Sequence, residues 1–171
     1  MSAAGAVDDR CGACGFDWTM PAESGIAAVA GCAEAYAAAL AGGDPRPRPA
    51  PDVWSPAEYT WHLVDVLAIG TERLVTLRVD PAAGIAVFDE GELARARHYD
   101  ALSPAVAPLV LARVAGGWVE AARRAPAGAR AAHPEWGTAS RLEVLRRNAH
   151  EVHHHLGDVE AGLARGAGGP R

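Results

Sequence analysis

Apolar residues recur at alternating spacings of three and four along four long segments of this chain, and no other sequence feature constrains its fold as strongly. Such spacing gathers apolar side chains on one face of a helix. The longest run begins at Ser140, where Glu143 completes a capping box. Its apolar positions keep the alternation for three heptads: Leu142, Leu145, Ala149, Val152, Leu156, Val159 and Leu163. This pattern predicts a bundle helix.

The first predicted helix runs from about Glu23 to Ala41 and ends at Gly42-Gly43, before a proline-rich stretch. Its apolar face consists of Ile26, Val29, Ala33, Tyr36 and Leu40. The second predicted helix has Ser55 as its N-cap, Pro56 in its first turn and Glu58 to complete a capping box. Its apolar face comprises Tyr59, Leu63, Val66, Gly70, Leu74 and Leu77, and the helix ends before Pro81.

The third predicted helix runs from Ser103-Pro104 to about Arg124. We expect its buried side to consist of Val106, Leu109, Val110, Val114, Trp118 and Val119. Gly116-Gly117 either weakens this helix or lets another helix approach closely. The connection before it, Pro81 to Leu102, is long for a bundle and is expected to be a crossover or a lid, with a short helix near Glu90 to Arg97.

Four amphipathic helices and no strand pattern predict an all-α fold, an antiparallel four-helix bundle with a long connection between its second and third helices. We expect an N-terminal tail at 1–21, the bundle at 22–165 and a flexible tail at 166–171. Half of the 171 residues are hydrophobic, enough for one domain with a core.

Composition excludes several functions. The chain has no lysine, which rules out a Schiff-base lysine and a P-loop lysine. Its net charge of −5 argues against nucleic-acid binding, and no apolar stretch is long enough to span a membrane. The first ten residues lack the apolar core of a secretory signal, so we expect a cytoplasmic protein whose partner is a small molecule.

Four of the seven histidines fall between Ala149 and Leu156. On a helical wheel, Glu151 and His155 lie at the edge of the apolar face, whereas His150, His153 and His154 point away and are expected to be solvated. His62 holds a similar edge position in the second helix. Two imidazoles and a carboxylate make a three-ligand set with open positions, typical of a catalytic metal. In the alternative interpretation no metal binds, His62 is a core histidine, and Glu151 is a partly exposed charge.

These residues resemble the DinB-like metal-binding four-helix bundles. The segment from Trp54 to Asp65 resembles the family helix that carries the first ligand, His62 here. The segment from Glu151 to Val159 is similar to the Glu-x3-His-x2-Asp pattern of mycothiol-dependent maleylpyruvate isomerases, in which Glu and His bind zinc. Other members use two histidines four apart, which here would be His150 and His154.

The resemblance implies a divalent cation, zinc or alternatively nickel, and often a homodimer. It also implies thiol chemistry, so we expect a transferase in which a low-molecular-weight thiol of the mycothiol type attacks a small electrophile. The alternatives are a non-catalytic metal-binding or stress-response protein, and a metal-dependent hydrolase with Asp158 as general base. Asp65 or His154 in the fourth coordination position would favour a structural metal. Phe88, Asp89 and Glu90 are candidates to line the electrophile pocket.

Cys11-Gly-Ala-Cys14 resembles half of a zinc knuckle and is a candidate for a second zinc. The remaining ligands could come from Cys32, His98 or His133, or from a second subunit. Free thiols and a redox pair are the other interpretations of this motif.

Overall fold

A computed structural model describes residues 9–167 and confirms the four-helix bundle. Its long helices are α1 (Ala22–Leu40), α2 (Pro56–Val79), α4 (Ala107–Arg124) and α5 (Arg141–Ala167). The last of these ends inside the segment 166–171 that was expected to be a tail, and residues 168–171 lie outside the described residues. No helix in the described range is both long and apolar enough to cross a membrane.

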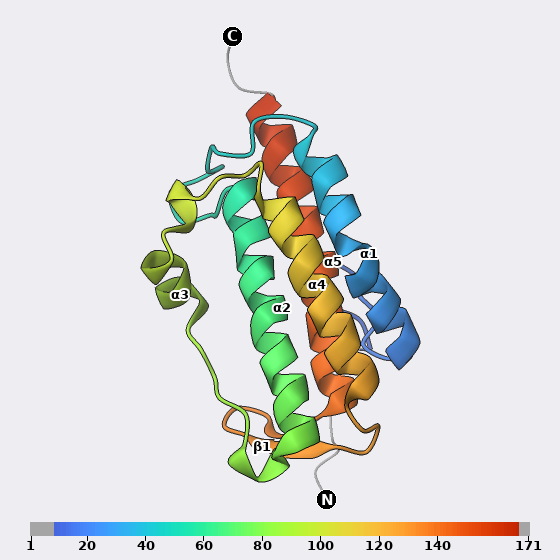
Figure 1. Ribbon diagram of the computed structural model, residues 1–171. Helices are drawn as coiled ribbons and strands as arrows, with labels where there is room; N and C mark the ends of the chain where they lie inside the picture. The colour runs from blue at the N-terminus through green and yellow to red at the C-terminus, as the bar shows by residue number, and fades with distance from the viewer. Residues whose placement is uncertain (1–8, 168–171) are drawn as a thin grey trace, which may run out of the picture.

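The order of the helices around the bundle differs from their order in the chain. Helices α1 and α2 both pack against α4 and α5 and make few contacts with each other, so they lie at opposite corners. Two helices run each way: α1 and α5 point in one direction, and α2 and α4 in the other (Figure 1). Each long helix therefore has one parallel and one antiparallel neighbour.

The long connection between α2 and α4 follows from these directions. Because both helices run the same way, the chain must return along the length of the bundle before α4 begins (Figure 1). This crossover contains three short helices, η1 (Pro81–Ala83), α3 (Glu90–Ala96) and η2 (Tyr99–Ala101). Buried Asp65 of α2 anchors it, since the Tyr99 hydroxyl donates to that carboxylate and Arg97 pairs with it at 2.6 Å.

Both predicted capping boxes are present. The backbone N–H of Ser55 donates to the Glu58 carboxylate at 2.8 Å, and the Glu58 N–H donates back to the Ser55 hydroxyl at 3.2 Å. Ser140 and Glu143 make the same reciprocal pair at the start of α5, at 2.6 and 3.2 Å. These bonds satisfy backbone donors that would otherwise lack partners at a helix start.

The predicted apolar faces of α1, α2 and α5 form the core, but the prediction for α4 was partly wrong. Val106 and Leu109 are 45% and 71% exposed. The side of α4 that packs into the bundle consists mostly of small residues around one fully buried tryptophan: Ala107, Leu111, Ala115, Trp118 and Ala122. The prediction placed the large apolar residues of this helix inside, whereas the inner face consists mainly of alanines.

Among the glycines of the described residues, Gly70 leaves the least room for a side chain, whereas the glycine pair of α4 faces open space. A Cβ atom at Gly70 would lie 2.1 Å from Oδ1 of Asn148, whereas nothing lies within 4 Å of one at Gly116 or Gly117. The Trp118 indole N–H donates to that same Oδ1 at 2.7 Å. A buried hydrogen bond between α4 and α5 thus passes directly over the backbone of α2.

Two features outside the bundle were not expected from the sequence. Strands β1 (Arg130–His133) and β2 (Gly137–Ser140) form an antiparallel hairpin between α4 and α5, with only four residues in each strand. Residues 9–21, expected to be a tail, pack on the bundle: Phe16 is buried, and Arg146 of α5 donates to the backbone oxygens of Thr19 and Met20.

Candidate metal centre

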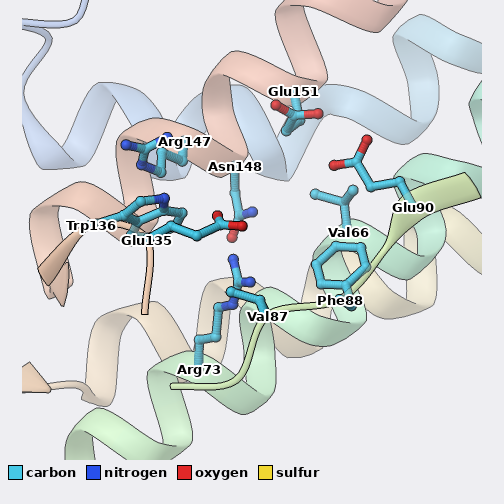
Figure 2. Close-up of a pocket in the computed structure, with 10 residues that line it drawn as sticks. All are labelled: Val66, Arg73, Val87, Phe88, Glu90, Glu135, Trp136, Arg147, Asn148 and Glu151. Carbon is cyan, nitrogen blue, oxygen red and sulfur yellow. The ribbon is translucent and has the colours of Figure 1, made fainter. Parts of the chain in front are cut away.

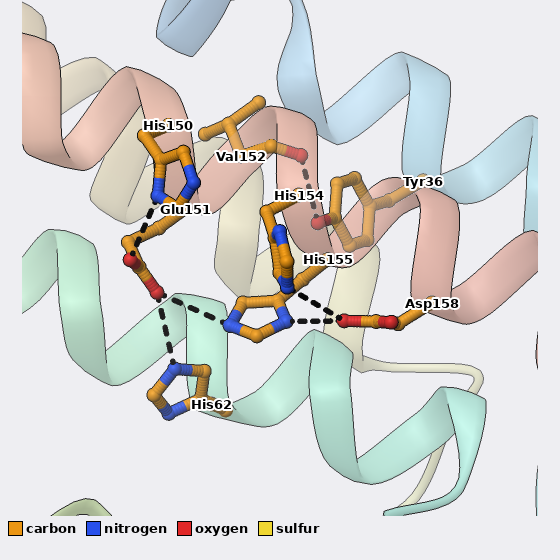
Figure 3. Close-up of polar contacts among 8 residues, drawn as sticks. All are labelled: Tyr36, His62, His150, Glu151, Val152, His154, His155 and Asp158. Carbon is orange, nitrogen blue, oxygen red and sulfur yellow. Dashed lines mark hydrogen bonds and ion pairs between the residues drawn. The ribbon is translucent and has the colours of Figure 1, made fainter. Parts of the chain in front are cut away.

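His62, Glu151 and His155 come together between α2 and α5 (Figure 3). The Oε2 atom of Glu151 lies 3.1 Å from Nε2 of His155 and 3.7 Å from Nε2 of His62. One ligand atom from each residue lies within 4.8 Å of the others. The structure thus brings together the three side chains that were predicted to bind one cation.

The surroundings of His62 suit a metal ligand. This side chain is fully buried, and within the described part of the chain neither of its ring nitrogens has a hydrogen-bond partner. A buried polar group without a partner costs free energy, and a bound cation would remove the cost at Nε2. Two aromatic rings enclose the site: Trp54 lies 5.0 Å from the His62 ring, and Tyr59 stacks on His155 at 5.0 Å.

Asp158 orients one of the candidate ligands. Its Oδ2 atom lies 2.8 Å from Nδ1 of His155, on the side of the ring opposite Glu151. A carboxylate in this position fixes the ring and makes the other nitrogen a better ligand. Asp158 is therefore engaged with His155, contrary to its expected availability as a general base.

The protonation of the cluster follows from its charges. Burial raises the pKa of the Glu151 carboxyl, but the hydrogen bond with His155 and the closeness of the His62 imidazole together outweigh burial and hold that pKa below its ordinary range. Burial lowers the pKa of His155, but Glu151 and Asp158 outweigh it and raise that pKa. Glu151 is thus an anion at neutral pH, as a carboxylate ligand must be.

Neither side chain considered for a fourth ligand joins this cluster. Asp65 is held by Tyr99 and Arg97. His154 groups with the N-terminal cysteines and also with His155 and Asp158, but not with His62 or Glu151. Within residues 9–167, the cluster around His62 offers three candidate protein ligands, and a three-ligand site keeps a position open for a small molecule.

The alternative pair on α5, His150 and His154, faces away from His62. Both rings were expected to be solvated, but both are only partly exposed, His150 at 14% and His154 at 29%, and the N-terminal segment covers His150. Trp18 stacks on His150 at 4.6 Å, and Phe16 meets the same ring edge-on at 5.3 Å. A segment more than 130 residues away in the sequence thus covers the His150 ring.

A cavity of about 210 Å³ opens beside the cluster, with Glu151 in its wall (Figure 2). Two arginines from different helices share one aromatic ring there: the guanidinium of Arg147 lies 3.9 Å from the Trp136 ring, and that of Arg73 5.3 Å from it. Neither arginine forms an ion pair with another described residue. The remaining lining residues are Val66, Val87, Phe88, Glu90, Glu135 and Asn148.

The cavity partly matches the residues expected to line an electrophile pocket. Phe88 and Glu90 of the crossover line it, whereas Asp89 caps α3 by accepting from the Glu92 N–H at 2.7 Å. Sequence reasoning missed Arg73, Arg147 and Trp136. The two arginines lie on polar helix faces, where a charge is ordinarily solvated, and Trp136 lies in the hairpin loop that no sequence pattern indicated.

Comparisons with known proteins agree with this architecture. The model of the DinB superfamily matches residues 31–159. Among solved structures, YfiT from Bacillus subtilis, described as a probable metal-dependent hydrolase with an unusual four-helix bundle topology, superposes with a TM-score of 0.75. The two chains are 15% identical over 87% of this chain and 89% of YfiT, a likeness that shows the fold. No curated protein matches the chain.

Proposed function

Because this chain belongs to the DinB superfamily and brings His62, Glu151 and His155 together, we propose that it is a metal-dependent enzyme that transfers a low-molecular-weight thiol to a small electrophile. The observation that carries the proposal is the double position of Glu151, which belongs to the ligand cluster and also to the wall of the cavity. A substrate in that cavity would lie next to the metal.

Two imidazoles and one carboxylate with an open position suit zinc, with nickel as the alternative. A divalent cation held there supplies a lowered pKa to a thiol or water ligand, and hence a nucleophile at neutral pH. The protein's own contribution is orientation: Asp158 holds the His155 ring, and Trp54 and Tyr59 pack against the rings of His62 and His155.

The cavity indicates the substrate class. Burial lowers the pKa of Arg73, Arg147 adds to the effect, and Glu135 and Glu90 oppose it. Neither guanidinium forms an ion pair with another residue that the structure describes, so an anion that contacted both would be favoured by their charges. We therefore propose that the thiol or the electrophile carries a carboxylate. In the transfer, sulfur bonds to the electrophilic carbon, the leaving group departs with its bonding electrons, and the thiol proton passes to solvent.

Hydrolysis is the second candidate, and one observation favours it. Glu90 lines the cavity together with Glu151 and is a carboxylate that the ligand cluster does not use (Figure 2). It could act as a general base toward water. Asp158, the base expected from the sequence, instead contacts His155. The description of YfiT as a probable hydrolase supports the same alternative.

The deciding experiment compares the two reactions on zinc-loaded protein. Turnover of a chlorinated aromatic carboxylate would be measured with mycothiol, glutathione and cysteine, beside hydrolysis of aryl esters and amides without thiol. We expect thiol-dependent turnover that His62→Ala and His155→Ala abolish and that His153→Ala, a change at an exposed position, retains.

Each other outcome selects a different function. Thiol-independent hydrolysis that Glu90→Gln abolishes would replace transfer by the hydrolase. Tight metal binding without turnover of any compound would favour the non-catalytic binding protein. Turnover that survives both His62→Ala and a chelator would contradict metal dependence itself.

A further inference from the structure

A second cluster of metal-ligating side chains lies on the opposite side of α5, outside the site described above. Cys11, Cys14, His150 and His154 each place one ligand atom within 4.8 Å of the other three. Two cysteines separated by two residues and two histidines separated by three match the spacing of structural Cys2His2 zinc sites. We propose that these four residues bind a structural zinc ion that fastens the N-terminal segment to the bundle.

The cysteines occupy a turn shaped to present both sulfur atoms to one ion. The Cys11 N–H donates to the Phe16 oxygen at 2.8 Å, and the Gly15 N–H donates to the Cys11 oxygen at 2.7 Å. Gly15 adopts a φ of +73°, a conformation that side chains disfavour. The turn lies between Arg10 and Asp17, which form an isolated antiparallel β-bridge. A tight turn that carries both cysteines fits the resemblance of this segment to half of a zinc knuckle.

The histidines supply the other half from one face of α5. They are four residues apart, so their rings lie side by side, with centroids 5.2 Å apart. Within residues 9–167, Nε2 of His150 and Nδ1 of His154 are buried and have no hydrogen-bond partner. These are the atoms left to bind an ion, and an unoccupied buried imidazole nitrogen is otherwise unfavourable.

The remaining ring nitrogens have carboxylates near them, as zinc-bound histidines usually do. Nδ1 of His150 lies 3.3 Å from Oε1 of Glu151, and Nε2 of His154 lies 3.7 Å from Oδ2 of Asp158 (Figure 3). Both carboxylates also contact His155, so Asp158 lies beside a candidate ligand of each centre, and Glu151 is a candidate ligand of the first centre and a neighbour of His150 in the second. Two thiolates and two neutral imidazoles balance the charge of Zn²⁺, which makes burial of the ion inexpensive.

The structure excludes the other ligands that the sequence suggested for the cysteine pair. Cys32 is 1% exposed in the core. His133 stacks on Trp136 in the hairpin region, and His98 lies at the start of η2. All four ligands come from one chain, so a second subunit is not needed.

Metal analysis of the full-length chain, purified under reducing conditions, tests this proposal. We expect two equivalents of zinc per chain, one in the Cys11→Ser/Cys14→Ser variant and one in His62→Ala. Cys32→Ala is the thiol control and should keep both. Because each double or single variant removes a different ion, failure of this site and failure of the proposed enzyme site are distinguishable.

Cobalt substitution gives a readout that does not depend on variants folding. Cobalt bound by two thiolates produces a sulfur-to-metal charge-transfer absorption in the near ultraviolet, which we expect in wild type and in His62→Ala. A wild-type spectrum without this absorption would overturn the proposal. So would a zinc content that is unchanged in the double cysteine variant, or a Cys11–Cys14 disulfide in protein purified with zinc and reductant.

Discussion

Asp158 lies one helical turn after His155 and holds the Nδ1 atom of that ring at 2.8 Å. This contact leaves Nε2 directed at Glu151 and, beyond it, at His62. A residue considered as a general base is thereby a positioning residue for a candidate ligand.

Replacing Asp158 with alanine should weaken metal binding at His62, Glu151 and His155 by about 10- to 100-fold, because an unsupported imidazole is a poorer and more mobile ligand. Zinc titration against a competing chelator measures the loss. The Cys11→Ser/Cys14→Ser background confines the titration to this site. Glu160→Ala, at an exposed position of the same helix, is the control; equal affinities in the two variants would remove Asp158 from the site.

Truncation of Leu145 should lower stability strongly and truncation of Leu109 should hardly change it, although both residues belong to predicted apolar faces. Leu145 is fully buried, so Leu145→Ala should lower the free energy of unfolding by about 2–5 kcal/mol. Leu109 is 71% exposed, and Leu109→Ala should change it by less than about 0.5 kcal/mol. Urea denaturation monitored by circular dichroism measures the free energy of unfolding of both variants. Similar losses in the two would mean that α4 is rotated from its described orientation.

Gly70 should be intolerant of any side chain. Gly70→Ala would push a methyl group into the Trp118–Asn148 hydrogen bond and cost about 1–3 kcal/mol of stability. Gly116→Ala meets open space in a helix and should instead stabilise the protein by roughly 0.5–1 kcal/mol. Thermal unfolding of both variants measures these changes in stability. A Gly70→Ala variant as stable as wild type would contradict the close approach of Asn148 to Gly70.

Glu58 should make stability depend on acid pH. Burial raises the pKa of this carboxyl, but hydrogen bonds from Arg48 and Ser55 outweigh burial and lower it. A lowered folded-state pKa contributes stability above the unfolded value of about 4.5, and this contribution is lost as pH falls through the folded-state pKa.

Glu58→Gln should therefore cost about 1–2 kcal/mol at pH 7, a figure limited by the partial exposure of Arg48. At a pH below the folded-state pKa, wild type and variant should be equally stable. Urea denaturation of metal-free protein at a series of pH values measures the difference. A difference that stays constant across the series would show that the Glu58 charge contributes nothing.

The helices and their starts could be read from the sequence because both are local properties. A capping box such as Ser55–Glu58 joins residues three apart, and the apolar face of α5 follows from a fixed rotation of about 100° per residue. The same rotation placed Glu151 and His155 on one side of α5, and His150 and His154 on the other. Two candidate ligand pairs on one helix were thus visible before any fold was known.

Only the tertiary structure decided what each pair meets. The order of the helices around the bundle brings His62 to Glu151, and the packing of Phe16 and Trp18 on α5 brings the cysteine turn to His150 and His154. Such contacts join residues about 90 to 140 positions apart, and no periodicity encodes them. They depend on which buried surfaces fit together, the same physical cause that places alanines rather than Leu109 on the inner face of α4.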